Sequence, residues 1–91
     1  MAVSLLKLGN GHLSLEFEPE DIDRVSVALK GIYGKPSVEK WPTLTNYKFP
    51  QANLVFQNEW DDPCLISGCA AGDEMLRHLA SDLGFSEQTE G

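Results

Sequence analysis

Residues 3–18, VSLLKLGNGHLSLEFE, decide the fold because they predict a β-hairpin at the start of the chain. Apolar and polar residues alternate on both sides of Asn10-Gly11, and this dipeptide between alternating runs is a strong signal for a two-residue turn. Such a turn sets four cross-strand pairs: Leu8 with Leu13, Leu6 with Leu15, Lys7 with Ser14, and Leu5 with Glu16. The face that carries Leu6 and Leu15 is therefore expected to belong to the core.

The hairpin leads into a predicted amphipathic helix over residues 19–34. Pro19 presets the backbone of a first helical turn, and the acidic residues that follow it suit the positive end of a helix. Gly34 is placed to cap the other end in a left-handed conformation. The apolar residues recur at spacings of three and four, which predicts one buried face made of Ile22, Val25, Leu29 and Ile32.

Three further strands are predicted after this helix, over residues 43–49, 54–60 and 64–67. Residues 35–42 contain two prolines and are expected to form a connecting loop that Trp41 anchors to the core. A four-residue loop at 50–53 pairs Tyr47 with Phe56 and Phe49 with Leu54. A turn at Asp61-Asp62-Pro63 then places Cys64 and Ile66 on the side of Phe56 and Trp60.

A second helix follows the glycine-containing segment 68–72, and Gly84 is in position to end it. Its apolar side is predicted to consist of Met75, Leu76, Leu79, Ala80 and Leu83. The complete pattern is an α+β fold of order β-β-α-β-β-β-α, with a mainly antiparallel sheet and two helices packed on one face. Residues 1–85 are expected to form a single domain, with Phe85 folded back on the second helix, and residues 86–91 a flexible C-terminal tail.

Length and composition agree with one globular domain. The chain has 91 residues, of which 42% are hydrophobic and 23% charged, and a second core would leave each half too small to fold independently. No apolar run approaches the length of a membrane span, and the N-terminus lacks the pattern of a secretory signal. A cytoplasmic protein is therefore expected.

The charge balance favours a basic partner. Fourteen acidic residues against seven lysines and arginines give a net charge of −7, which repels phosphate backbones and anionic lipids. Nucleic-acid and membrane binding are therefore not expected. A small acidic domain is instead steered toward positively charged proteins.

The cysteines and histidines give no specific catalytic or metal-binding signal. Cys64 and Cys69 are five residues apart, so along one extended strand their side chains would point to opposite faces, and a disulfide is not expected. With His12 and His78 they match no zinc pattern. Cys69 precedes the second helix, but the carboxylates of the first helical turn oppose a reactive thiolate, so a small buried cysteine is expected. His12 lies on the side of the first hairpin that carries Ser14 and the glutamates. We expect no catalytic residue, metal or cofactor.

The second face of the sheet, opposite the helices, is predicted to mix apolar and charged residues as an interface does. In the predicted register this face carries Val3, Leu5, Leu44, Val55 and Leu65 among Lys7, Glu16, Glu18, Lys48, Gln57 and Glu59.

These observations predict a non-enzymatic acidic protein-binding module, of the immunity or antitoxin kind that inhibits a basic partner. The residues expected to bind that partner are Glu16, Glu18, Glu59, Trp60, Asp61 and Asp62. Trp60 is either an exposed anchor or a core residue. Two alternatives remain: a homodimeric structural or regulatory domain, and a small enzyme that uses His12 or Cys69.

Overall fold

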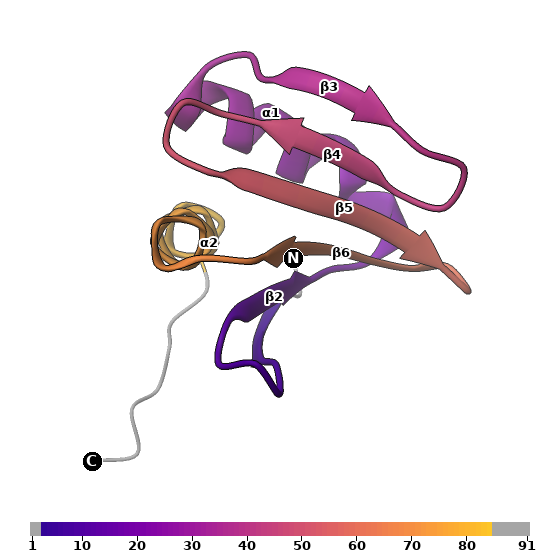
Figure 1. Ribbon diagram of the computed structural model, residues 1–91. Helices are drawn as coiled ribbons and strands as arrows, with labels where there is room; N and C mark the ends of the chain where they lie inside the picture. The colour runs from indigo at the N-terminus through magenta and orange to yellow at the C-terminus, as the bar shows by residue number, and fades with distance from the viewer. Residues whose placement is uncertain (1–2, 85–91) are drawn as a thin grey trace.

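The computed structural model describes residues 3–84, except for the side chain of Glu59. Within these residues a β-hairpin, a four-stranded antiparallel meander and two α-helices build one layered unit (Figure 1). The elements are β1 (Ser4–Lys7), β2 (Leu13–Glu16), the 3-10 helix η1 (Pro19–Asp21), α1 (Ile22–Tyr33), β3 (Ser37–Lys40), β4 (Thr45–Lys48), β5 (Asn53–Glu59), β6 (Asp62–Ser67) and α2 (Ala70–Asp82).

The described strands form one six-stranded sheet in the order β1-β2-β6-β5-β4-β3, with every neighbouring pair antiparallel. The predicted α+β class, the antiparallel sheet and the packing of both helices on one face are confirmed. The predicted order is also confirmed, with one strand added, because β3 occupies part of the segment expected to be a loop.

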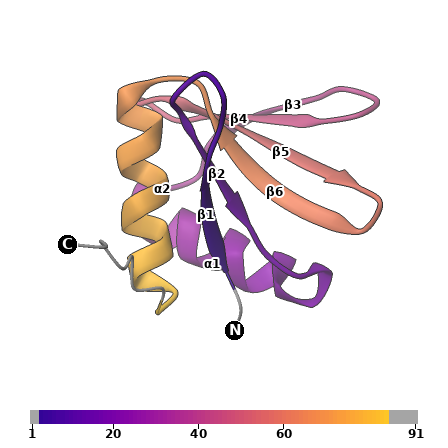
Figure 2. The ribbon, with the colours of Figure 1, turned by 90° about the horizontal axis from the view of Figure 1, so that it is seen from below.

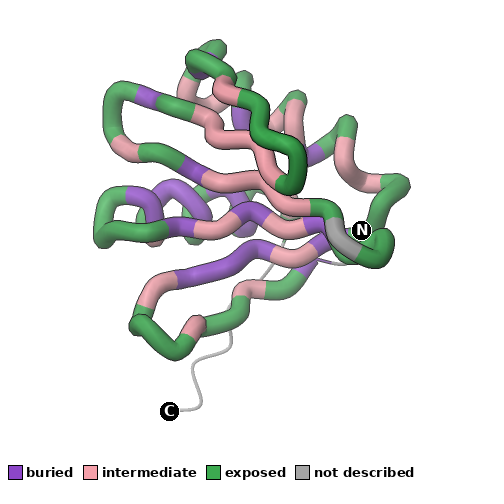
Figure 3. The backbone as a smooth tube through the Cα atoms, turned by 45° about the vertical axis from the view of Figure 1, so that its right-hand side comes forward, coloured by how far each residue is buried: buried purple, intermediate pink, exposed green. Residues whose placement is uncertain are grey.

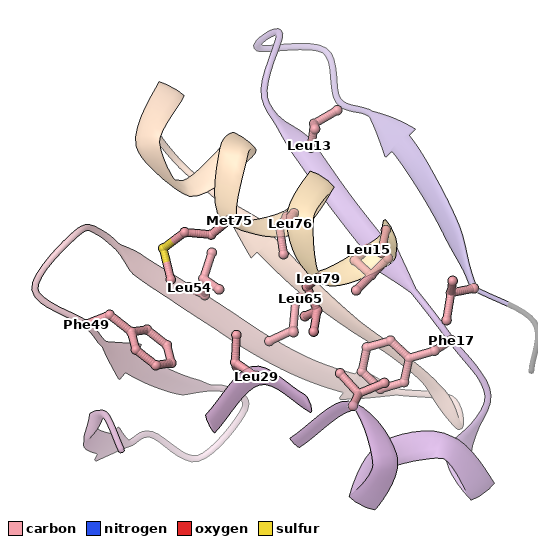
Figure 4. Packing of buried hydrophobic residues seen from close by; sticks show 13 residues of the cluster. Leu13, Leu15, Phe17, Leu29, Phe49, Leu54, Leu65, Met75, Leu76 and Leu79 are labelled. Atoms are coloured by element: carbon pink, nitrogen blue, oxygen red, sulfur yellow. The ribbon is translucent and has the colours of Figure 1, made fainter. Parts of the chain in front are cut away.

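Both helices contribute to a single core on one face of the sheet (Figure 2). α2 packs on β1, β2 and β6. α1 contacts α2 and lies at the bottom of the view in Figure 2. Leu15, Leu54 and Leu65 from the three central strands are fully buried beneath Leu76 and Leu79 of α2. Figure 4 shows Leu65 and Leu79 near the centre of this cluster. The predicted apolar faces of the two helices are therefore confirmed.

The first hairpin is present, but its predicted register is wrong by one residue. Leu5 pairs with Leu15 and Lys7 with Leu13, because the turn has three residues instead of two. The Leu8 N–H donates to the His12 carbonyl, and Gly11 takes the left-handed conformation, φ 87°, that closes such a turn. A shift of one residue moves every side chain of β1 to the other face.

The second face of the sheet therefore differs from the prediction. Val3, Leu5 and Leu65 belong to the core on the helix side and not to the second face. The register places Leu6, Ser14, Ile66 and Val55 in one row across the second face, followed by Asn46 and Glu39. Figure 3 shows burial concentrated in the central strands, with exposure rising toward the β3–β4 hairpin.

The other predicted strands are present near their predicted positions, but the residue pairs between them differ from the prediction. Tyr47 pairs with Leu54 and not with Phe56, because the Phe49 N–H donates to the Ala52 carbonyl and shortens the loop to Pro50-Gln51. A shift of two residues leaves each side chain on its predicted face. Leu65, and not Cys64 or Ile66, shares the face of Phe56, because β6 begins at Asp62 and pairs Phe56 with Leu65.

Trp41 is not the core anchor that the sequence predicted. Its side chain is 56% exposed at the end of β3, and its indole Nε1–H donates to Glu39 Oε1 at 3.0 Å. Glu39 also pairs with Lys48 Nζ at 3.2 Å. The loop prediction failed because short edge strands of polar residues resemble loops in sequence.

Both predicted glycine caps are confirmed, since Gly34 and Gly84 have φ of 84° and 90°. The predicted contact of Phe85 and the predicted tail over residues 86–91 lie outside the described residues. Neither described helix combines the length and apolar content needed to cross a membrane.

Candidate functional site

The turn between β5 and β6 exposes a tryptophan in a strained backbone conformation. Glu59 pairs with Asp62, so the turn consists of Trp60 and Asp61 alone. Their φ values of 58° and 55° are the left-handed pair that a two-residue turn of type I′ requires. Aspartate tolerates this region, but for a bulky side chain it costs about 1 kcal/mol. A glycine or an asparagine would relieve this cost at position 60.

Trp60 is an exposed side chain and not a core residue. Its side chain is 96% exposed, more than that of any other large hydrophobic residue described, and it has no aromatic or hydrogen-bonding partner among the described residues. The position therefore combines backbone strain with an apolar surface left in water. Neither feature stabilises the fold, which makes the turn a candidate for function.

Four carboxylates gather around this turn. Asp61 and Asp62 belong to the turn and to the start of β6. Glu16 pairs with Cys64 at the end of β2, and the Phe17 N–H donates to the Pro63 carbonyl at 3.2 Å, which brings Glu18 to the same end of the sheet. We call this set the acidic tip; it comprises Trp60, Asp61, Asp62, Glu16 and Glu18. The backbone of Glu59 pairs with that of Asp62 beside this turn, but the side chain of Glu59 is not among the parts that the structure describes.

The acidic tip keeps its negative charge uncompensated. The ion pairs found among the described residues lie elsewhere, at His12–Asp73, Lys48–Glu39 and Arg77–Glu74. Burial raises the pKa of the Cys64 thiol, and the charges of Glu16 and Asp62 add to this effect, against the lowering effect of hydrogen bonds with Ser14 and with the Gln57 backbone. The structure therefore places Trp60, Asp61, Asp62, Glu16 and Glu18 at one end of the sheet, and four of these five side chains are carboxylates.

A second polar cluster joins the first hairpin to α2. His12 Nδ1 lies 2.9 Å from Asp73 Oδ2, and the Leu13 N–H donates to Asp73 Oδ1 at 3.0 Å. Burial alone raises the pKa of the Asp73 carboxyl, but the interactions with His12, with the nearby Ser67 side chain and with the Leu13 N–H outweigh it, so the pKa lies below its ordinary value. The sequence analysis placed His12 beside Ser14 and the glutamates and did not identify Asp73 as its partner.

Cys69 is exposed, and the expectation that it is buried is wrong. It is the N-cap of α2, and its Sγ accepts a hydrogen bond from the Gly72 N–H at 3.4 Å. Ser67 supports the same turn, because its hydroxyl donates to the Cys69 carbonyl at 2.8 Å. The His12 ring is bonded to Asp73 instead of to a thiol, so the nucleophile and base are not paired as thiol catalysis requires.

His78 and the two cysteines form no catalytic or metal-binding cluster among the residues that the structure describes. His78 is exposed and meets the Tyr33 ring edge-on, with centroids 6.0 Å apart. Both cysteines are free. In the described part of the chain, no three histidine, cysteine or carboxylate side chains converge as ligands for a metal ion.

By its fold, this protein is a small α+β protein with one open antiparallel sheet. Comparison of the chain with protein-family models, with curated proteins and with solved structures finds no match in any of the three.

Proposed function

We propose that this protein is a non-enzymatic, acidic protein-binding module, and that the acidic tip is the surface that meets its partner. The observation that carries the proposal is Trp60, 96% exposed on a two-residue turn with a strained backbone. Tryptophan is the residue type most enriched among the side chains that dominate binding energy, because it buries a large rigid surface with little loss of entropy.

The surroundings of Trp60 define the chemistry of the partner. An indole flanked by Asp61 and Asp62 fits an apolar slot whose rim carries lysine or arginine side chains. An arginine at the rim gains twice, because its guanidinium can stack on the indole and pair with a carboxylate. Glu16 and Glu18, from β2 and the segment after it, extend the negative surface beside the turn.

The net charge of −7 acts over a longer range than these contacts. It attracts a positively charged protein before the two surfaces meet and raises the association rate at low salt. A small domain that places carboxylates and one aromatic anchor on a basic surface occludes that surface. We therefore propose an inhibitor of the immunity or antitoxin kind, whose partner is a protein with a basic active site.

The rigidity of the tip supports the same proposal. The turn joins β5 and β6, which are paired from Glu59 with Asp62 to Leu54 with Ser67 at the centre of the sheet. The backbone that carries Trp60 is therefore ordered before binding, so only the rotamer freedom of the indole is lost when the partner engages it.

The test compares matched baits in affinity capture from the native lysate at low salt. The baits are the intact protein, Trp60→Ala and Trp41→Ala, which removes another exposed tryptophan from a neighbouring loop. A second pair, Asp62→Lys and Asp82→Lys, makes the same charge change at the tip and on α2. The proposal predicts one basic protein, released by salt, that the intact bait, Trp41→Ala and Asp82→Lys recover and that Trp60→Ala and Asp62→Lys lose. Equal recovery by all baits, or recovery of only untagged copies of the chain, contradicts it.

A further inference from the structure

A cavity of about 250 Å³ lies between α1 and the core face of the sheet, and none of the acidic tip carboxylates lines it. Its walls are mainly apolar, with Val25 and Leu29 from α1 and Phe56 and Leu65 from β5 and β6 among the lining residues. A cavity of about 150 Å³ in a protein core is enough to hold benzene, so this one has room for a ring with a short chain.

The cavity exists because α1 covers its part of the sheet incompletely. The buried side chains of α1 are two, Val25 and Leu29, whereas α2 buries four, Met75, Leu76, Leu79 and Ala80. Phe56 and Tyr47 consequently remain only half-buried on the core face of the sheet. Two aromatic rings left partly uncovered inside a groove form an apolar surface that a ligand can cover.

Two aromatic contacts fix the direction of the cavity along α1. Phe17 stacks on Phe56 at 6.3 Å near the start of α1, and Tyr33 meets Phe49 edge-on at 6.0 Å at the end of the helix. The cavity lies between these contacts. Tyr47, two residues before Phe49, therefore lines the part toward the end of α1.

The polar groups of the cavity wall are arranged along one stripe of α1. Asp23, Ser26 and Lys30 recur at spacings of three and four, so they share a face, and seven residues separate the charges by about 10 Å. The Lys30 ammonium has no carboxylate partner among the described residues, and the Tyr47 hydroxyl has no hydrogen-bond partner there. A donor and a cation are thus left at one end, and a carboxylate stands at the other.

We propose that this cavity binds a small apolar carboxylate, with its ring or branched chain between Phe56, Leu65 and Val25 and its carboxylate at Lys30 and Tyr47. Asp23 repels the anion at the opposite end, so the ligand enters in one orientation. The site is independent of the proposed function of the acidic tip.

The test uses 3-phenylpropionate as the probe and 3-phenylpropylamine, of the same size and opposite charge, as its control. Each is titrated into the labelled protein up to about 10 mM, which covers the millimolar affinity of a fragment, and the backbone amide shifts are followed by NMR. We expect saturable shifts of residues in α1, β4 and β5 with the carboxylate, and binding of the amine that is several-fold weaker.

Two variants and one matched control make the assignment specific. Ser26→Leu fills the cavity and should abolish the saturable shifts, whereas Val27→Leu, on an exposed position outside the cavity wall, should keep them. Lys30→Gln should weaken the carboxylate about three- to fivefold, the effect of one partly screened charge pair. The absence of saturable shifts in the intact protein, shifts confined to other elements, or equal affinity for the amine overturns the proposal. If Ser26→Leu does not fold, the result for Lys30→Gln decides.

Discussion

Asp73, in the first turn of α2, bonds to His12 of the first hairpin, with 2.9 Å between Asp73 Oδ2 and His12 Nδ1. The second carboxylate oxygen accepts the Leu13 N–H at 3.0 Å, so one side chain links the start of the helix to the turn end of the first hairpin across 60 residues of sequence. The side chain of Asp73 is only 13% exposed, which protects this tie from solvent. It is the clearest polar link between two elements of this fold.

This link predicts how stability depends on pH. The pKa of Asp73 lies below its ordinary value of 3.8, so the unfolded state binds more protons than the folded state between these two values. The contribution is therefore complete above the unfolded pKa and is lost as the pH falls through the folded pKa. Asp73→Asn should lower the free energy of unfolding at pH 7 by about 1–3 kcal/mol and flatten its decline in acid. Urea titrations from pH 7 to 3, with exposed Asp82→Asn as control, measure both effects.

Gly72 is required by the close approach of α2 to β6. A Cβ at this position would lie 2.5 Å from the Ser67 Oγ and 3.2 Å from the Ser67 Cβ. Gly72→Ala should therefore destabilise the fold by about 1–3 kcal/mol, despite the better helix propensity of alanine. Gly31→Ala is the matched control, because nothing lies within 4 Å of that Cβ and the substitution should stabilise α1 by about 0.5–1 kcal/mol. Thermal unfolding that shifts the two variants in the same direction would refute this account.

The register of the first hairpin is tested by two adjacent leucines. Leu5 packs against the core and Leu6 is 45% exposed on the second face. Leu5→Lys should cost about 2 kcal/mol, because it places a charge toward the core, and Leu6→Lys should change the stability by less than about 0.5 kcal/mol. The predicted two-residue turn requires the reverse order, so the relative unfolding midpoints in urea distinguish the two registers.

The two cysteines should differ in reactivity. Burial and the neighbouring carboxylates raise the pKa of Cys64, so its thiol remains protonated at neutral pH, whereas Cys69 is exposed. A disulfide reagent at pH 7.5 should modify Cys69 in a fast phase and Cys64 in a slow one. Cys69→Ser should remove the fast phase and Cys64→Ser the slow phase; the opposite assignment would place the thiols differently.

Local periodicity was enough to predict the helices, because the apolar residues around Leu29 and those around Leu79 recur at helical spacing. Gly34 and Gly84 mark the ends of the two helices. Register was harder. The sequence around Asn10-Gly11 allows two turn lengths that differ by one residue, and the choice depends on whether Leu5 or Leu6 meets α2, which is a tertiary contact. β3 was missed because its pairing with β4, and not its own composition, makes it a strand.

The candidate surface was predicted more completely than the polar cluster. Trp60, Asp61 and Asp62 are adjacent in sequence, so any turn there brings them together. What the sequence left open was the exposure of Trp60, which depends on a turn of two residues that points the indole away from the sheet. The contact of His12 with Asp73 has no local signal, because the partners are far apart along the chain and each has nearer polar neighbours.

Strain at Trp60 gives the last prediction and the most direct test. Because glycine adopts a positive φ without cost and the exposed indole contributes no packing, Trp60→Gly should raise the free energy of unfolding by about 0.5–1 kcal/mol. Under the proposed function the same substitution should also remove partner binding, because the indole is the proposed anchor.

The decisive measurement is quantitative affinity capture from the native lysate with the intact protein, Trp60→Gly and Trp41→Ala as baits, after their unfolding curves have been recorded. The account predicts that the intact protein and Trp41→Ala recover equal amounts of one basic protein. Trp60→Gly should be the most stable of the three baits and yet recover about tenfold less of that protein. Equal recovery with Trp60→Gly would contradict the claim that the acidic tip binds the partner through its tryptophan.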